Sequence, residues 1–317
     1  MTQSRTRLLV AFLLVYLIWG STYLAIRVAI GSMPPLVMGS IRFLIAGTAM
    51  WTWARVTTGA RATRAEWRGG LIVGTLLLFG GNGAVIWSEQ RVPSGIAALL
   101  VAVVPLWMVL LDWARPGGIR PRNVVFAGLA LGLAGLALLV GPGGFNGGGG
   151  GVDPVGAGVL MLGSLSWAVG SLYSKKAPRA GSPILNAGIQ MLGGGFALAI
   201  ASFATGEAAH FHLAAITLRS ALAVGYLITF GSLVGFTAYL YLLAHTTPAK
   251  ASTYAYVNPV VAVFLGWAIA GEPVTPRTLI AATVILASVA LISTRGGTGK
   301  VKTTPAEPPG AAPRRAA

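Results

Sequence analysis

The chain alternates between long apolar runs and short polar segments. Ten of these runs approach the length of about 20 predominantly apolar residues that a membrane-spanning helix requires. They cover residues 8–26, 36–53, 71–87, 96–113, 124–140, 155–173, 184–203, 222–243, 251–270 and 279–292. The pattern therefore predicts an all-α membrane protein with ten transmembrane helices.

The first run follows Arg5 and Arg7, so a cleaved signal peptide is the alternative reading of it. Its apolar character continues as far as Ile26, which is longer than a typical signal core, and many further apolar runs follow it. We therefore expect this run to be retained as a transmembrane helix.

Similar features recur in the same order on both sides of a glycine-rich segment at residues 141–153, which divides the ten runs into five and five. Three pairs match: Trp19 with Trp167, residues 77–80 with residues 228–231, and Pro105 with Pro259. Because five is odd, the second half must enter the membrane with the opposite orientation. The result is a pair of inverted five-helix repeats, the architecture of many secondary transporters.

This repeat predicts the domain organisation. We expect a cytoplasmic N-terminal tail, a first repeat, an external glycine-rich linker, a second repeat and a basic, disordered cytoplasmic tail. These segments are residues 1–7, 8–140, 141–153, 154–294 and 295–317.

Basic residues divide unequally between the two sides of the predicted membrane. With the N-terminus inside, 18 of the 23 Lys and Arg residues fall in cytoplasmic segments and four fall outside, while Arg42 lies within a run. Since Lys and Arg collect in cytoplasmic loops, we expect a multi-pass protein of the inner membrane with both termini in the cytoplasm.

Composition agrees with a membrane protein and explains the net charge of +16. The chain is 55% hydrophobic and only 9% charged, whereas about 25% of the residues of a soluble domain are charged. Its basic residues are spread over separate loops without interleaved aromatic residues, so we expect no nucleic-acid partner. The lipid bilayer is the expected surrounding.

Several short motifs together carry a family resemblance. In the first half they are Leu-Ile-Trp-Gly-Ser-Thr-Tyr at 17–23, Pro34-Pro35 followed by Arg42-Phe43, and Val-Pro-Ser-Gly at 92–95. In the second half they are Pro-Val-Val-Ala at 259–262, Gly266-Trp267 and Gly271-Glu272. With these motifs the chain resembles the EamA-type transporters of the drug/metabolite transporter superfamily, over nearly its whole length.

The resemblance implies a ten-helix inner-membrane carrier whose central cavity is lined by helices of both repeats. Such a carrier moves small metabolites or amino acids, often outward. The substrate differs among members of the family, so the resemblance does not identify it.

Arg42 is the costliest residue within the apolar runs, because a charged group inside a membrane needs a partner. At helical rise it lies roughly 10 Å below the external surface. A guanidinium in this place can attract an anionic substrate group such as a carboxylate, in bidentate geometry. The alternative is a structural arginine that is satisfied by carbonyl groups at helix ends.

Further candidate substrate-binding residues combine aromatic rings or amides with small neighbours. Trp19 and Tyr23 lie in the first motif, Trp167 is the counterpart of Trp19, and Asn82 is flanked by three glycines. Aromatic faces beside small residues can line a cavity. Close helix packing and hydrogen bonding between helices are the structural alternatives.

The seventh and ninth runs supply the remaining candidates. Asn186 and Gln190 share a helix face, and we include Gln190 in the site, with interhelical hydrogen bonding as its alternative. In the ninth run Tyr256 lies on one face, while Tyr254 and Asn258 lie on another. We choose Tyr256 and Asn258 as binding residues.

Pro105 and Pro259 are the candidate hinges. Each lacks an amide hydrogen and so leaves a carbonyl oxygen one turn earlier in the helix free to accept a bond from substrate or a side chain. The alternative is a kink that needs no ligand.

The acidic residues and histidines indicate neither catalysis nor metal binding. The runs hold no acid pair and no nucleophile with a base, so we expect no catalytic residue, metal site or cofactor. Glu89 lies near the external end of the third run. We expect it to be an exposed or interfacial carboxylate, with proton coupling as the alternative.

The preferred function is secondary transport, in the direction of export, of a small-molecule substrate by alternating access around a central cavity. An intramembrane lipid-modifying enzyme is one alternative, and a channel-like or multidrug efflux component is another. The spacing of Gly70 with Gly74 and of Gly128 with Gly132 permits close helix contact, within the chain or between copies. We expect a monomer or a weak homodimer.

Overall fold

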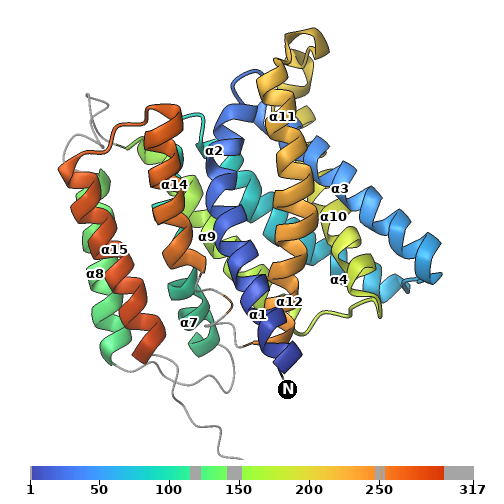
Figure 1. Ribbon diagram of the computed structural model, residues 1–317, viewed down its shortest axis with the longest axis horizontal. Helices are drawn as coiled ribbons and strands as arrows, with labels where there is room; N and C mark the ends of the chain where they lie inside the picture. Colours follow the sequence, from blue (N-terminus) through green and yellow to red (C-terminus); the bar gives the residue numbers. More distant parts are fainter. Residues whose placement is uncertain (1, 115–122, 141–151, 247–250, 252–253, 296–317) are drawn as a thin grey trace, which may run out of the picture.

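The described part of the chain is helical, as the computed structural model shows (Figure 1). The structure describes residues 2–114, 123–140, 152–246, 251 and 254–295. Over these ranges it contains no β-strand, so the prediction of an all-α chain is confirmed for them.

The helices of the first half are α1 (Thr2–Leu14), the π-helix η1 (Val15–Trp19), α2 (Gly20–Ala29), α3 (Pro35–Thr58), α4 (Arg64–Gly74), the π-helix η2 (Thr75–Gly83), α5 (Ala84–Ser88), α6 (Ser94–Val101), α7 (Val104–Ala114) and α8 (Asn123–Val140). Those of the second half are α9 (Pro154–Ser174), α10 (Pro183–Ala204), the 3₁₀-helices η3 (Glu207–His210) and η4 (Leu213–Ala215), α11 (Leu218–Tyr226), the π-helix η5 (Leu227–Phe236), α12 (Thr237–His245), α14 (Tyr254–Ala270) and α15 (Pro276–Arg295). Each predicted apolar run overlaps one of these helical segments.

Seven helical segments are long and apolar enough to cross a membrane. They are Arg5–Ala29, Pro35–Thr58, Arg64–Ser88, Ser94–Ala114, Pro154–Ser174, Pro183–Ala204 and Leu218–His245. The helices α8, α14 and α15 are not among the seven. The arrangement of ten transmembrane helices in two inverted repeats therefore stays a prediction.

Glycines allow α3 and α10 to pack closely along one edge of the bundle (Figure 1). A Cβ atom added to Gly47 would lie 2.8 Å from the backbone nitrogen of Leu192, and one added to Gly188 would lie 2.8 Å from that of Trp51. No side chain fits at either contact, so the two backbones approach directly. At the opposite edge α8 packs against α15.

Two acidic side chains close helix N-termini at one end of the molecule. Glu207 accepts a hydrogen bond from the backbone nitrogen of Leu36 at 2.8 Å, at the start of α3. Glu272 accepts bonds from the backbone nitrogens of Ser94 and Gly95, at 2.9 and 3.2 Å, at the start of α6. Both carboxylates satisfy orphan amide donors and favour the positive end of a helix dipole.

Three π-helical segments interrupt the α-helices, and each carries or adjoins residues of the cavity described below. η1 ends at Trp19, η2 contains Asn82, and η5 contains Gly231 and Ser232. Short π-helical segments inside α-helices are frequent at functional sites. The segments η2 and η5 also contain the two matched tetrapeptides at 77–80 and 228–231.

Candidate functional site

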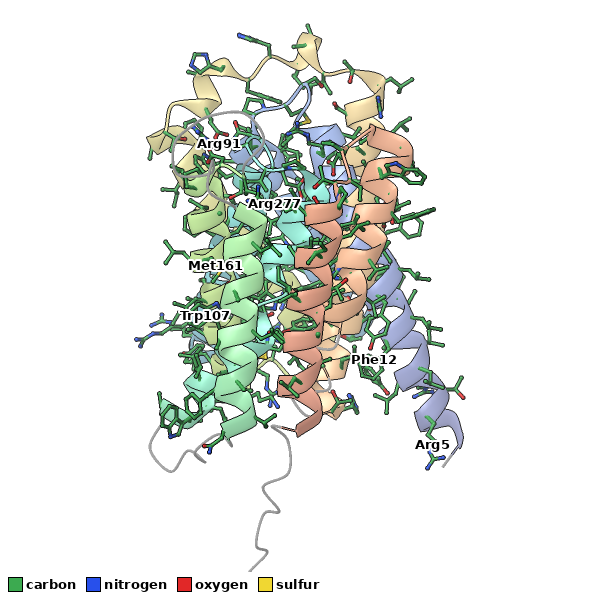
Figure 2. All side chains as sticks on the ribbon, turned by 90° about the vertical axis from the view of Figure 1, so that its left-hand side faces the viewer. Arg5, Phe12, Arg91, Trp107, Met161 and Arg277 are labelled. Carbon is green, nitrogen blue, oxygen red and sulfur yellow. The ribbon has the colours of Figure 1, made fainter. Side chains whose placement is uncertain are left out.

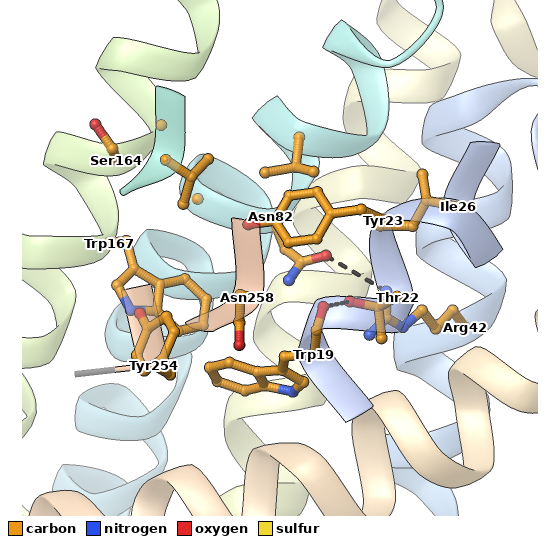
Figure 3. A pocket seen from close by; sticks show the side chains of 14 residues that line it. Trp19, Thr22, Tyr23, Ile26, Arg42, Asn82, Ser164, Trp167, Tyr254 and Asn258 are labelled. Carbon is orange, nitrogen blue, oxygen red and sulfur yellow. Dashed lines mark hydrogen bonds between the residues drawn. The ribbon is translucent and has the colours of Figure 1, made fainter. Parts of the chain in front are cut away.

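A small cavity lies between helices of both halves of the chain (Figure 3). Its aromatic and polar lining comes from η1, α2, α3, η2, α9 and α14, and consists of Trp19, Thr22, Tyr23, Arg42, Asn82, Ser164, Trp167, Tyr254 and Asn258. The volume is about 50 Å³, whereas one water needs roughly 10–15 Å³. The cavity thus has room for a few waters, and a larger molecule requires the lining to move.

Four aromatic rings pack together beside the cavity, and three of them, Trp19, Trp167 and Tyr254, line it. The ring centroid of Trp19 lies 5.5 Å from that of Trp167, 5.0 Å from that of Tyr239 and 5.3 Å from that of Tyr254. These separations are typical of favourable aromatic pairs. These rings therefore join the first half of the chain, through Trp19, to three helical segments of the second half.

Hydrogen bonds fix both indole rings. Trp19 donates through Nε1 to the carbonyl oxygen of Gly231 at 3.1 Å, and Trp167 donates through Nε1 to the hydroxyl of Tyr239 at 3.1 Å. The Tyr239 hydroxyl also lies 2.8 Å from Oγ of Ser171. Because both indole N–H groups are satisfied by the protein, the rings offer a substrate their apolar faces.

Arg42 reaches the cavity from α3 and is only 2% exposed. Its Nε donates to Oγ of Ser232 at 2.9 Å. Its Nη1 donates to Oδ1 of Asn82 at 3.4 Å (Figure 3). The guanidinium carbon also lies 4.7 Å from the ring centroid of Phe43. Within the described part of the chain, no carboxylate lies within ion-pair distance of Arg42. Neutral partners thus hold the guanidinium in place, and its charge is not cancelled by a direct ion pair.

Asn258 is buried and joins α14 to η1. Its surroundings assign the amide nitrogen to a position 3.1 Å from the carbonyl oxygen of Tyr16 and 3.2 Å from that of Tyr254. Both neighbours are acceptors, so only the nitrogen fits between them. The side chain therefore connects the two helices as well as lining the cavity.

The structure brings six of the eight predicted binding residues together around this cavity: Trp19, Tyr23, Arg42, Asn82, Trp167 and Asn258. Their predicted contacts with substrate stay predictions.

Gln190 and Tyr256 are the other two. Gln190 is buried, but it is not part of the lining, and its backbone packs against α4, where a Cβ atom on Gly74 would lie 1.8 Å from its carbonyl oxygen. The sequence placed Gln190 and Asn186 on one helix face, but it did not show which helix that face contacts. The side chain of Tyr256 lies outside the described residues.

Several residues of the site were not selected from the sequence. Tyr254 lines the cavity, while Ser232 and Tyr239 hold its walls. The spacing of four residues between Tyr254 and Asn258 was a usable signal, because it places both on one helix face. No local pattern in the sequence marks Ser232 or Tyr239 as part of the site.

The two predicted hinges differ. The helical span that contains Pro105 is broken just before it, because α6 ends at Val101 and α7 begins at Val104. Val101 lies beside the cavity. By contrast, α14 continues through Pro259 from Tyr254 to Ala270.

Glu89 is not exposed, so that part of the expectation was wrong. The residue follows the last residue of the Arg64–Ser88 segment, and its exposed fraction is 0%. Arg27 of α2 donates to its backbone carbonyl and helps to cover it. Local hydropathy did not reveal this burial, because distant parts of the chain cause it.

Comparisons with known proteins agree with the membrane character of the chain. The model of the EamA-like transporter family matches it twice, over residues 6–141 and 154–294. The chain is 40% identical over 285 residues to the Uncharacterized inner membrane transporter YedA of Escherichia coli (strain K12), which covers 89% of each protein. It is 26% identical over 295 residues to the Uncharacterized transporter YvbV of Bacillus subtilis (strain 168), covering 92% of this chain and 93% of that protein.

A solved crystal structure has the same fold. It matches with a TM-score of 0.64 at 22% sequence identity, over 90% of this chain and 96% of the other. The two family matches cover most of the sequence, one on each side of the glycine-rich segment, and the lining of the cavity draws on both. The chain therefore belongs to the EamA-like transporter family, within the drug/metabolite transporter superfamily.

Proposed function

We propose that this protein is a secondary transporter that exports small metabolites or amino acids across the inner membrane by alternating access. The observation that carries the proposal is the small cavity between the two family matches, where Arg42 meets aromatic walls from both halves. A buried cation without a direct ion pair suits a carboxylate. The faces of Trp19 and Trp167 suit an apolar or aromatic portion of the same molecule.

Ten transmembrane helices in two inverted repeats are part of the proposal. Two packed pairs, α3 with α10 and α8 with α15, each join a helix of the first half to its expected counterpart in the second. The π-helices η2 and η5 contain the tetrapeptides that match between the halves. These correspondences support a repeat in which movement of one half against the other exposes the cavity to each side in turn.

Cytoplasmic termini and an inner-membrane location also belong to the proposal. The relative YedA is named an inner membrane transporter. Figure 2 places Arg91 and Arg277 toward the end of the molecule opposite Arg5, which supports the assignment of these residues to opposite sides of the membrane.

The natural sequence has no cysteine, which makes a direct test of orientation possible. Single Arg5→Cys and Arg91→Cys variants would be treated in intact cells with a maleimide that cannot cross membranes. We expect label at position 91 only, and at position 5 after lysis. Labelling of position 5 in intact cells would contradict the proposed topology and indicate the opposite orientation.

Proteoliposomes that contain the purified protein would test transport. Radiolabelled amino acids, sugars, nucleosides and organic acids would be offered to the vesicles, and each accumulated compound would be checked for chemical change. We expect saturable movement of an unchanged carboxylate compound, and its loss in Trp19→Ala. Gly158→Ala is the control, since nothing lies within 4 Å of a Cβ atom there. Chemical conversion would favour the lipid-modifying enzyme, and single-channel conductance would favour the channel.

The proposal includes a monomer or a weak homodimer. Gly70 and Gly74 contact Ile189 and Gln190 of α10 within the same chain, so this pair of small residues is already used inside the molecule. Light scattering of the purified protein over a range of concentrations would test the state of association.

A further inference from the structure

Glu89 differs from four other acidic side chains, each of which binds backbone groups at the start of a helix. Glu66 and Asp153 cap the starts of α4 and α9, and Glu207 and Glu272 bind the starts of α3 and α6. Glu89 is fully buried, and neither of its carboxyl oxygens has a hydrogen-bond partner among the described residues. A buried carboxylate without hydrogen bonds is costly, so this group needs a proton or another cation.

Glu89 lies one helical turn after a residue that lines the cavity. Val85 lines the cavity, and its carbonyl oxygen accepts a bond of 3.0 Å from the backbone nitrogen of Glu89 one turn later. Ile26 also lines the cavity, and the next residue, Arg27, donates to the backbone carbonyl of Glu89. The cavity and the carboxyl group are thus separated by roughly one helical turn.

Charged and titratable groups face Glu89 from several sides. Tyr23 and Arg27 come from α2, Arg42 comes from α3, and Glu272 follows α14. Burial raises the pKa of Glu89 well above its ordinary value, and Glu272 raises it further, while Arg27 and Arg42 act in the opposite direction. The helix α9 carries no charged residue, and the carboxylate of Asp153, which caps its start, lies 3.6 Å from the guanidinium of Arg91.

We propose that Glu89 is a proton-binding site whose occupancy controls how tightly the cavity binds an organic carboxylate at Arg42. The second part of this inference rests on the proposed function. With Glu89 ionised, the two arginines and the two glutamates carry equal and opposite charge. Protonation of Glu89 leaves one positive charge uncompensated, and Arg42 is the member of this group that lines the cavity.

The sign of the coupling follows from this charge balance. A carboxylate in the cavity binds more tightly when Glu89 is neutral, so its affinity rises as pH falls. By thermodynamic linkage the bound carboxylate favours protonation of Glu89 to the same degree. Binding of the anion is therefore accompanied by proton uptake.

Infrared spectroscopy of the purified, ligand-free protein would test the proton site itself. We expect the carbonyl stretch of a protonated carboxyl at about pH 7, well above the usual range for glutamate. The band should persist in Glu89→Asp and Glu207→Gln but vanish in Glu89→Gln. A missing band in the natural protein, or an unchanged band in Glu89→Gln, would overturn the proposal, whatever the result of the transport assay.

Benzoate would test the link to the cavity, with uncharged benzamide as the matched probe. Benzoate stays ionised at both about pH 6 and about pH 9, so any change in its affinity reports on the protein. Calorimetry should show binding that is at least about fivefold tighter at the lower pH. Proton uptake should appear as a dependence of the measured heat on the buffer.

The variants decide between the outcomes. Glu89→Gln should bind benzoate equally at both pH values without proton uptake, whereas Glu207→Gln should retain the pH dependence. The binding of benzamide should not depend on pH. If the affinity of the natural protein for benzoate did not change with pH, or if benzoate did not bind, the link to Arg42 would be overturned. Transport without the infrared band of a protonated Glu89 would support the proposed function and contradict this inference.

Discussion

The indole rings of Trp19 and Trp167 meet edge to face, with centroids 5.5 Å apart and planes at 85°. The two residues occupy matching positions in the two halves of the chain, and both line the cavity. The contact therefore joins the halves at the proposed binding site.

This contact should appear as an energetic coupling between the two tryptophans. In a double-mutant cycle of Trp19→Ala and Trp167→Ala, we expect a coupling free energy of about 0.5–1.5 kcal/mol. Reversible unfolding in mixed detergent would measure it. The control cycle pairs Trp19→Ala with Trp267→Ala, whose ring is largely exposed on α14. That pair should be additive within roughly 0.5 kcal/mol, and equal coupling in both cycles would contradict direct contact as the cause.

Arg42→Gln should weaken the binding of carboxylate substrates more than that of uncharged ones. A lost hydrogen bond to a charged group costs about 1.5–3 kcal/mol, which corresponds to roughly tenfold to hundredfold in affinity. Competition against the transported compound in proteoliposomes would measure the difference.

Arg91→Gln is the matched control, since the Arg91 side chain is half exposed and pairs with Asp153. We expect this variant to bind both kinds of compound as the natural protein does. If Arg42→Gln lost affinity for carboxylate and uncharged compounds equally and also unfolded more readily, the role of the guanidinium would be to stabilise the fold through Ser232 and Asn82.

Gly74→Ala should destabilise the protein strongly. The new Cβ atom would lie 1.8 Å from the carbonyl oxygen of Gln190, so the backbones of α4 and α10 must separate. Strain of this kind typically costs about 1–3 kcal/mol. Gly158→Ala on α9 meets nothing within 4 Å, and it should gain roughly 0.5–1 kcal/mol from helix propensity. Thermal unfolding in detergent should move in opposite directions for the two variants.

Glu207 should make stability depend on pH. Burial raises the pKa of its carboxyl above the ordinary value, although hydrogen bonds from the backbone of Leu36 and Val37 act the other way. The folded state therefore holds this proton more tightly than the unfolded chain does. Its contribution to stability is present at low pH and is lost as pH rises from about 4.5 through the folded pKa.

Glu207→Gln should flatten that part of the profile. Thermal unfolding measured across the acidic range would show it, with Glu66→Gln in the cap of α4 as the comparison. A steeper profile in Glu207→Gln would contradict the assigned sign.

Local features of the sequence predicted much of the fold and of the cavity. The length of the apolar runs determines where helices form, so each predicted run overlaps a helix. Arg42, Trp19 and Asn82 stood out because a charge, a large ring or an amide is unusual among small apolar neighbours. These signals depend on residues close together in the chain.

Features that depend on distant residues were not predictable in this way. Glu89 is buried by contacts such as that with Arg27 of α2, although its own neighbourhood resembles a membrane interface. Tyr254 and Tyr256 are two residues apart, which turns their side chains by roughly 200° around a helix. Without a reference direction toward the bundle, the sequence alone did not show that Tyr254 faces the cavity.

The π-helix η2 places a limit on insertions and deletions. A π-helix holds more residues per turn than an α-helix, so the direction of every later side chain depends on the number of residues in Thr75–Gly83. Deletion of one residue there could leave the segment helical, yet it would turn the following residues by roughly 100°. Val85 and Glu89 would then leave the cavity end together. The length of this segment is therefore as much a determinant of the site as the identity of any side chain in it.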